Sequence, residues 1–438
     1  MTAPAIPPAG DYWLRDVRIP GAPAERLERA DLRIAAGRIA AIAPVGTAGD
    51  GPSLDGGMAL PCFVDVHTHL DKGHIWPRSA NPDGSFLGAL AAATADRAAH
   101  WSAADIRARF DFGLRCAYAH GTAAIRTHLD TDLPQGRATW QVFAALRDAW
   151  AGKIDLQGVS LCPIDRLAGE AGAALADLVA AAGGVLGFVT RFTGGGHDAI
   201  PPGFPELLDH AFALAEARGL DLDLHVDESG ATAAATLPMI ARTAIRRRFK
   251  GRLQVGHVCS LSLQPDAVIE ETIRLVREAG IAVVSLPMCN MYLQDRAPGR
   301  TPRWRGVTLL RELAAAGVPV SVASDNCRDP FYAYGDHDMV EVFQSAVRIA
   351  HLDHPLGDWP ASVTATPAAV MGLSEHGRVR VDAPADLVLF RARFWHEWLA
   401  RRQSDRIVLR RGRAIDTRPP DYRELDALTG IDRHPTPV

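Results

Sequence analysis

The sequence predicts an α/β protein that folds as a (β/α)8 barrel of the TIM type and carries a small β-sandwich domain built from both chain ends. Two observations predict the barrel: short β-like runs alternate with long amphipathic stretches, and about eight such units over about 270 residues match the size of this barrel. A third observation predicts the small domain, because both ends follow a similar pattern of short strands and turns.

The two chain ends contain short stretches in which apolar and polar residues alternate, with turns at Gly37-Arg38 and Gly412. These stretches are residues 12–14, 31–34, 39–42, 378–381, 386–390 and 407–409. We therefore expect residues 1–58 and 375–438 to form one β-sandwich domain, and residues 59–374 to form the barrel.

The middle of the chain contains eight strand candidates, which are residues 59–66, 123–127, 154–161, 184–190, 220–226, 252–257, 281–286 and 318–324. Helical stretches separate most of them, for example residues 104–120, 205–218, 265–280 and 307–317. A doubly wound open sheet is the competing interpretation, but it predicts a glycine-rich phosphate loop after an early strand. The sequence contains neither G-x-G-x-x-G nor a Walker motif, which favours the barrel.

Composition limits the classes of partner. The chain has 438 residues, of which 47% are hydrophobic and 22% charged, and its formal net charge is −4. We expect no binding to nucleic acid or to an anionic membrane, and no apolar run approaches the roughly 20 residues that span a bilayer. Six scattered cysteines without a C-x-x-C pair, and an N-terminus without the pattern of a signal peptide, predict a soluble cytoplasmic protein.

The strongest chemical signal is an apolar strand that ends in His67-Thr68-His69. Residues i and i+2 of a strand share one face, so both imidazoles can meet one metal ion. Two histidines at a strand end can also be simple polar caps. The metal interpretation gains weight because other strand ends carry compatible groups.

Three further strand candidates end in such groups. The fifth carries His225 near its end and is followed by Glu228, the sixth ends at His257, and the eighth is followed by Asp325. The carboxyl ends of barrel strands meet at one face, where the active sites of such barrels lie. We therefore expect these side chains to gather at one site.

Ligand chemistry predicts one divalent ion, Zn²⁺ or Fe²⁺, because imidazole and carboxylate ligands suit both zinc and iron. We expect His67, His69, His225 and Asp325 to hold it. A bound metal lowers the pKa of its water from about 15.7 toward about 7, which provides hydroxide at neutral pH. Glu228 and His257 would then remain for catalytic proton transfer and for orienting that water.

The order of these motifs resembles that of the amidohydrolase superfamily. In detail the chain is similar to the cytosine deaminase group at five segments, which are residues 126–130, 225–228, 293–296, 305–308 and 329–332. The resemblance implies the four metal ligands named above, with Glu228 as the proton shuttle and His257 as the residue that polarises the substrate. Many members instead carry two metals bridged by a carboxylated lysine on the fourth strand. Residues 184–190 contain no lysine, which predicts a single-metal deaminase.

The predicted substrate pocket departs from that group. A glutamine that reads the pyrimidine amide edge in the group is replaced by Ile164 or its neighbour Pro163, and a stacking tryptophan is replaced by Phe331. Asn326 stands where the group has an acid, and Lys72 directly follows the first metal-binding strand. A site that loses a polar reader disfavours the substrate that needs it, so cytosine is in doubt.

The sequence predicts hydrolytic release of ammonia from a small nitrogen heterocycle, either another aminopyrimidine, a pterin-like bicycle or an aminotriazine. Hydrolysis of a cyclic amide or an N-alkyl amine bond at the same metal is the alternative. A non-catalytic metal-binding protein is a third interpretation, which the base Glu228 disfavours. Whether the chain assembles into a homo-oligomer stays open.

Overall fold

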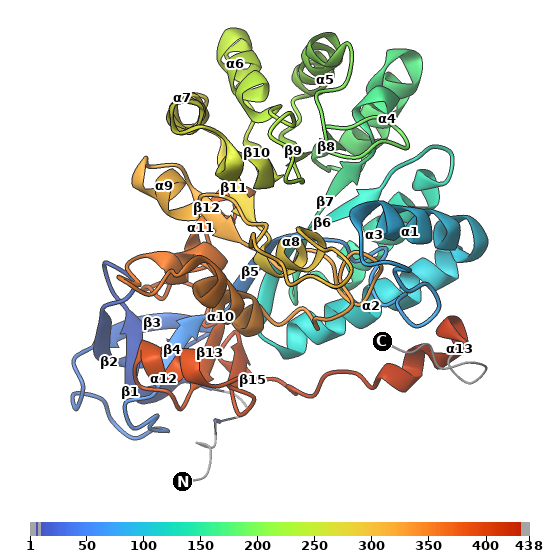
Figure 1. Ribbon diagram of the computed structural model, residues 1–438. Coiled ribbons are helices and arrows are strands. Elements are labelled where there is room, and N and C mark those ends of the chain that lie inside the picture. The colour runs from blue at the N-terminus through green and yellow to red at the C-terminus, as the bar shows by residue number, and fades with distance from the viewer. Residues whose placement is uncertain (1–5, 8–9, 431–438) are drawn as a thin grey trace.

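The computed structural model describes residues 6–7 and 10–430 of the chain, and its centre is a barrel of parallel strands surrounded by helices (Figure 1). The barrel strands are β5 (Phe63–Thr68), β6 (Thr122–Asp130), β7 (Asp155–Leu161), β8 (Leu186–Val189), β9 (Leu222–Val226), β10 (Leu253–His257), β11 (Ala282–Ser285) and β12 (Val320–Val322). Each of the eight predicted runs overlaps one of these strands, so the predicted barrel is confirmed.

Two hydrogen-bonded sheets make up the barrel: β5-β6-β7 and β8-β9-β10-β11-β12. Isolated parallel bridges join them at both seams. Val159 pairs with Val185 between β7 and β8, and Thr68 pairs with Asp325 where β5 meets the segment after β12. The second seam places Asp325 beside the strand that carries His67, whose carbonyl accepts a bond from the Asp325 backbone N–H at 2.9 Å.

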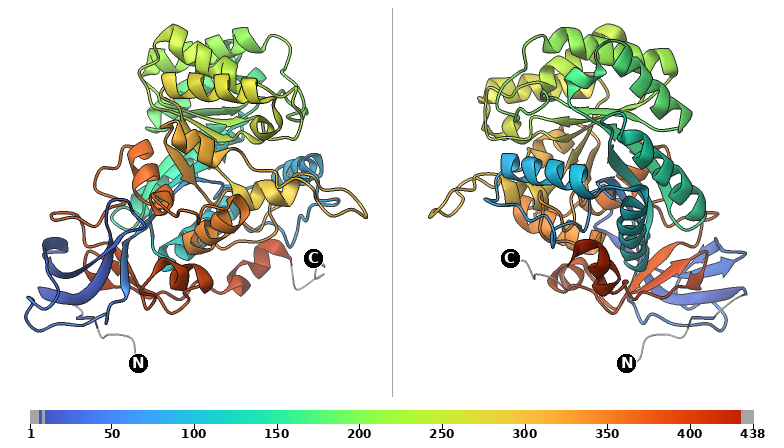
Figure 2. Two further views of the ribbon diagram at one scale, coloured as in Figure 1. Left: turned by 60° about the vertical axis from the view of Figure 1, so that its left-hand side comes forward. Right: turned by 90° about the vertical axis from the view of Figure 1, so that its right-hand side faces the viewer.

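Helices cover the outside of the barrel (Figures 1 and 2). Those that lie between or beside barrel strands in the sequence are α1 (Phe86–His100), α2 (Ala103–Ala119), α3 (Gly136–Ala149), α4 (Gly169–Ala181), α5 (Phe204–Arg218), α6 (Leu237–Arg247), α7 (Asp266–Glu278), α8 (Pro287–Leu293), α9 (Leu310–Ala315), α10 (Met339–Ala350) and α11 (Ala365–Met371). Short 3-10 turns are η1 (Ile164–Leu167), η2 (Cys259–Leu263), η3 (Trp359–Val363) and η4 (Tyr422–Leu425), and α12 (Trp395–Ala400) and α13 (Asp426–Thr429) follow near the C-terminus.

A second, mixed sheet combines strands from both ends of the chain. Its strands are β1 (Tyr12–Pro20), β2 (Leu27–Ala35), β3 (Arg38–Ala43), β4 (Met58–Pro61), β13 (Leu387–Phe390), β14 (Ile407–Arg410) and β15 (Arg413–Ala414), in the order β15-β14-β13-β4-β1-β2-β3. The sheet curls so that its two edges approach each other: the Ile39 N–H donates to the Ala383 carbonyl at 2.9 Å, and the Tyr12 hydroxyl donates to the Gly412 carbonyl at 2.7 Å.

The curled sheet encloses a core of its own, to which Leu14, Ile39 and Leu409 contribute from distant strands of the sheet order. The predicted union of both chain ends in one small β unit is therefore confirmed. Its seven strands belong to one hydrogen-bonded sheet that wraps around this core. The boundaries 1–58 and 375–438 stay a prediction, and residues 1–5, 8–9 and 431–438 of that range lie outside the described residues.

Three predicted elements differ from the structure. The run 59–66 is divided between β4 and β5, which belong to different sheets, because Pro61 has no N–H with which to continue the pairing. Residues 378–381 form no strand, and the left-handed Asp382 (φ 65°) follows them directly. The helix expected at 307–317 is only α9 (Leu310–Ala315), since Gly306 is left-handed and Leu309 lies outside helical geometry.

The main hydrophobic core lies between the barrel and its helices, with fully buried residues such as Phe110, Phe188 and Phe212. No helix in the described part of the chain is long and apolar enough to cross a membrane. The barrel therefore provides a rigid ring of strand ends on which polar side chains can be positioned.

Candidate active site

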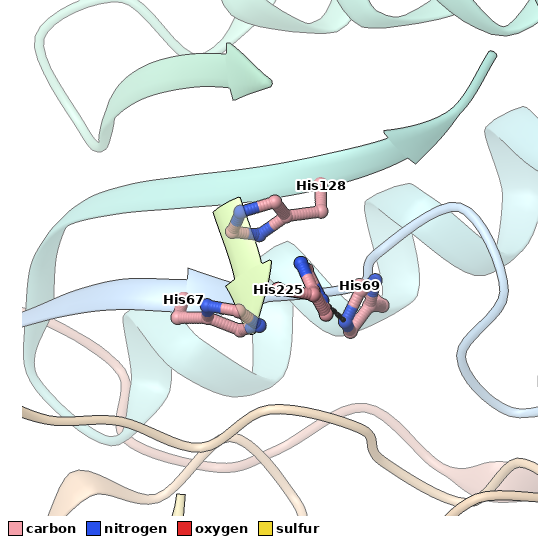
Figure 3. Close-up of side chains that lie close together, drawn as sticks. All are labelled: His67, His69, His128 and His225. Atoms are coloured by element: carbon pink, nitrogen blue, oxygen red, sulfur yellow. Dashed lines mark hydrogen bonds between the residues drawn. The ribbon is translucent and has the colours of Figure 1, made fainter. Parts of the chain in front are cut away.

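The carboxyl ends of four barrel strands bring the predicted polar residues together. His67 lies in β5 and His69 just beyond it, His225 lies in β9, His257 ends β10, and Asp325 follows β12. All five side chains are buried. Figure 3 shows His67, His69 and His225 gathered at this point, with His128 of β6 beside them.

The imidazoles lie within the range expected for groups that share one ion. Asp325 Oδ1 is 3.2 Å from His69 Nε2 and 3.6 Å from His67 Nε2, and the Nε2 atoms of His69 and His225 are 3.4 Å apart. Two sets of residues here could hold a metal ion, and within each set the potential ligand atoms lie within 4.8 Å of one another. One set is His67, His69, His128 and His225, and the other is His67, His257 and Asp325.

The electrostatics of this cluster suit a cation. Burial is the main cause that lowers the pKa of His67, His69 and His225 well below 6.5, which leaves neutral imidazoles with free lone pairs. Burial likewise raises the pKa of Asp325 to about 7. Both carboxylate oxygens of Asp325 and both ring nitrogens of His67 lack a hydrogen-bond partner among the described residues. Unpaired buried lone pairs of this kind are the donor set that Zn²⁺ or Fe²⁺ would occupy.

The loops that follow β9, β10 and β12 bend sharply at left-handed residues. Asp227, His257 and Asp325 have φ values of 49°, 70° and 62°. Asp227 anchors its bend, because its carboxylate accepts bonds from Thr236 N–H at 3.0 Å and Leu237 N–H at 3.1 Å. Asp227 is thus occupied by backbone donors, and the next residue, Glu228, is turned into the site.

Glu228 and His257 form a pair at the edge of the cluster. Glu228 Oε1 lies 3.4 Å from His257 Nδ1, and burial, with the neighbouring Asp325, raises the pKa of Glu228 well above 4.5 despite Arg191 and Lys72. A carboxyl of raised pKa is a stronger base, which suits a group that accepts and returns a proton.

Asn290 of α8 is a partner of this pair that sequence reasoning did not assign. Its side-chain nitrogen lies 2.9 Å from His257 Nδ1. With the amide donating to Nδ1, the neutral ring of His257 carries its proton on Nε2, which has no partner among the described residues. His257 can therefore present an N–H donor to a bound molecule.

His128 and Asp223 form a second layer beneath the cluster. The His128 ring lies 4.0 Å from the His67 ring, and its Nε2 is 3.4 Å from Asp223 Oδ1. Arg126 and Gln254 donate to Asp223 Oδ2 at 2.9 and 2.8 Å. Asp223 was missed from sequence, although its position two residues before His225 places both on one face of β9.

The predicted substrate residues lie in different surroundings. Lys72 is buried, pairs with Asp130 at 2.9 Å, and stands 5.5 Å from the centre of the half-buried Phe331 ring. Asn326 is buried and donates to Asp329 at 2.7 Å. Ile164 begins η1 and is completely buried in the main core, so its contact with a substrate stays a prediction.

Aromatic and cationic side chains from other segments of the chain also lie near Phe331. The Phe86 ring centre lies 5.7 Å from that of Phe331 and 5.4 Å from that of His197. The Arg191 guanidinium stands 5.8 Å from the Phe86 ring. Neither Phe86, which begins α1, nor His197, which lies in the loop between β8 and α5, was singled out from sequence, because neither stands at the end of a predicted strand.

The opposite ends of β10, β11 and β12 lack such a cluster among the described residues. A cavity of about 850 Å³ lies there, and Leu253, Ala282 and Val320, at the starts of β10, β11 and β12, line it. No histidine or cysteine is among the described residues that line this cavity. The strand carboxyl ends therefore carry the candidate active site.

Comparison with known proteins places the chain in a family. The model of the amidohydrolase family matches residues 179–415, and a pterin deaminase from Rhizobium rhizogenes strain K84 is 55% identical over 417 residues, which cover 94% of this chain and 93% of the relative. The chain belongs to the amidohydrolase family. This amidohydrolase is an enzyme that acts on C–N bonds, and the expected family relationship is confirmed.

More distant relatives are similar to the chain in sequence or in fold. The N-isopropylammelide isopropyl amidohydrolase of Pseudomonas sp. strain ADP is 25% identical over 386 residues, 84% of this chain and 89% of the relative. The 5-methylcytosine deaminase of Klebsiella pneumoniae, solved with 5-fluorocytosine, superposes with a TM-score of 0.78 at 23% identity, over 94% of this amidohydrolase and 98% of that chain. The structural likeness supports the fold of barrel and mixed sheet.

Proposed function

We propose that this amidohydrolase hydrolytically removes an exocyclic amino group from a pterin-like bicyclic heterocycle and releases ammonia. The observation that carries the chemistry is a buried carboxyl, Glu228, next to His257 at the rim of the imidazole cluster. The 55% identity to a pterin deaminase over nearly the full length supports the bicyclic substrate.

We assign one divalent ion, Zn²⁺ or Fe²⁺, to His67, His69, His225 and Asp325, in the cytoplasm, where the six buried free thiols would stay reduced. When bound, such an ion supplies a strongly acidified water next to the substrate carbon. Asp325, whose Oδ1 lies 3.2 Å from His69 Nε2, would supply the carboxylate ligand of this set.

Glu228 moves the protons in this proposal. Its carboxylate takes one proton from the attacking water and delivers it to the ring nitrogen next to the amino-bearing carbon. The Nε2–H of His257, fixed by Asn290 at Nδ1, donates to the developing charge. Glu228 then transfers the second water proton to the amino group, the C–N bond breaks, and ammonia and the oxo product leave.

The residues around Phe331 fit a flat, fused ring. Phe331 packs edge to face against Phe86, with ring centres 5.7 Å apart, and aromatic side chains favour contact with flat rings. Two buried cations stand beside these rings, Arg191 and the Lys72 that pairs with Asp130, and they suit carbonyl oxygens or an acidic substituent on the substrate.

A panel of substrates tests the proposal. Purified protein, loaded with zinc or iron, is incubated with pterin, cytosine, an aminotriazine and an N-alkylaminotriazine, and ammonia, alkylamine and oxo products are measured. We expect ammonia from pterin with a kcat/KM above that for the monocycles. Release of alkylamine without ammonia would instead favour the N-alkyl hydrolysis named in the second relative.

A further inference from the structure

A second cluster of potential ligands lies outside the proposed active site. His74, Cys327 and His337 each offer one ligand atom, and these three atoms lie within 4.8 Å of one another. His74 belongs to the loop after β5, whereas Cys327 and His337 belong to the segment between β12 and α10. The cluster therefore joins two loops that are far apart in sequence.

Burial leaves the cluster without ordinary partners. His74, Cys327 and His337 are each 2% exposed. Both ring nitrogens of His74 and both of His337 lack a hydrogen-bond partner among the described residues. A neutral imidazole has one N–H and one lone pair, and each buried group left unpaired costs about 1–3 kcal/mol. One nitrogen of each ring, together with the Cys327 thiol, is a set that one bound ligand would satisfy.

The packing keeps the three side chains in position. The ring centres of His74 and His337 lie 5.8 Å apart, and the Phe112 ring packs edge to face against His74 at 4.8 Å. A Cβ at Gly113 of α2 would stand only 3.1 Å from His337 Nε2, so glycine leaves the space that this imidazole fills. The His74 backbone N–H donates to the Cys327 carbonyl at 3.0 Å.

The charge around the cluster is compatible with a cation. Asp336 acts electrostatically on His74, Cys327 and His337, while Arg328 supplies opposing positive charge. The Asp336 carboxylate is itself engaged by His120 at 3.0 Å and by the Tyr422 hydroxyl at 2.9 Å. Asp336 adds negative charge near the cluster, but its carboxylate is not free to act as a base.

We propose that His74, Cys327 and His337 hold a second, structural metal ion, of the thiolate- and imidazole-preferring class represented by zinc. The ion would tie the loop after β5 to the loop after β12. These loops directly follow His69 and Asp325, so the ion would fix the spacing between two residues of the active site. Its acidic neighbour in the described part of the chain, Asp336, is engaged by His120 and Tyr422, which distinguishes it from the site of Glu228.

Metal content tests this proposal without reference to activity. Purified full-length chain is saturated with zinc, freed of excess metal by gel filtration and measured by elemental analysis. Wild type should hold about two equivalents per chain, and Cys327→Ala and His337→Gln about one. Cys62→Ser, which changes a buried cysteine that contacts the Leu409 carbonyl, should keep about two. Wild type with one equivalent, or variants that keep two, would overturn the proposal.

Cobalt substitution keeps the test decisive if a variant does not fold. Cobalt bound by a thiolate absorbs in the near ultraviolet by charge transfer, whereas the proposed active-site ligands contain no sulfur. We expect this band in cobalt-loaded wild type and in His69→Ala, which loses only the first ion. A cobalt-loaded wild type without the band would overturn the proposal, because Cys327 would then bind no metal ion.

Discussion

The molecule contains two imidazole clusters that differ in what surrounds them. The first, His67, His69 and His225 with Asp325, stands on strand ends and adjoins a buried carboxyl, Glu228. The second stands on loops, and its acidic neighbour is held by other side chains. Similar ligand atoms thus occur beside a carboxyl that can exchange a proton, Glu228, and beside a carboxylate already engaged by other side chains, Asp336. The contrast indicates that the carboxyl of Glu228, more than the ligand atoms, distinguishes the proposed reactive site from the proposed structural one.

Metal removal should give the largest effect and tests whether the first cluster depends on its ion. Dialysis against a strong chelator is expected to lower deamination to the level of a buffer blank, and zinc or iron should restore it. His69→Ala should behave like the chelated protein but resist restoration. Full activity in a sample proven metal-free by elemental analysis would contradict the proposal that the first cluster acts through a bound ion.

Glu228→Gln tests the proton carrier directly. The amide keeps the shape of the side chain but cannot accept a proton, so kcat should fall about 10²- to 10⁴-fold while the metal content of the cluster is unchanged. Steady-state kinetics and elemental analysis on the same preparation measure both quantities. Glu341→Gln, on the exposed side of α10, serves as the control and should retain wild-type kcat.

Asn290→Ala tests the positioning of His257. Without the bond to Nδ1 the ring can take the other tautomer, and loss of such a supporting partner typically costs about 10- to 100-fold in activity. The fall should appear in kcat, with KM near wild type, and Asn290→Ser should recover part of it. Gln344→Ala removes another buried amide, which bonds the Trp398 carbonyl at 2.7 Å, and should affect stability only.

Phe331→Ala should give the smallest of these effects. Removal of one aromatic face is expected to weaken substrate binding by about 1 kcal/mol, or roughly fivefold in KM, with little change in kcat. Phe331→Tyr keeps the ring and should stay near wild type. A large fall in kcat with unchanged KM would instead place Phe331 in the support of Lys72 and Asp329.

The barrel and its first cluster were predictable because two local rules converge. Alternation along β5 places His67 and His69 on one face, and parallel strands deliver His225, His257 and Asp325 to the same end. These rules need only the order of residues along each strand, and the structure brings all five side chains together.

Other features depend on tertiary contacts that leave no local pattern. Asn290 reaches His257 from α8, and His74 meets Cys327 only because the barrel closes between β5 and the segment after β12. Ile164 begins the η1 turn and is buried in the core, so its predicted contact with a substrate depends on loop geometry and stays a prediction. Such contacts are set by loop paths, which sequence periodicity does not describe.

The curled sheet has a consequence for biosynthesis. Its strand β4 pairs with β13 on one side, and β13 leaves the ribosome only after the entire barrel has been translated. The four N-terminal strands must therefore wait, with one edge unpaired, until the last part of the polypeptide emerges. The sheet can be completed only late in synthesis. Chains that terminate early would leave the edge of β4 unpaired and exposed to aggregation or proteolysis.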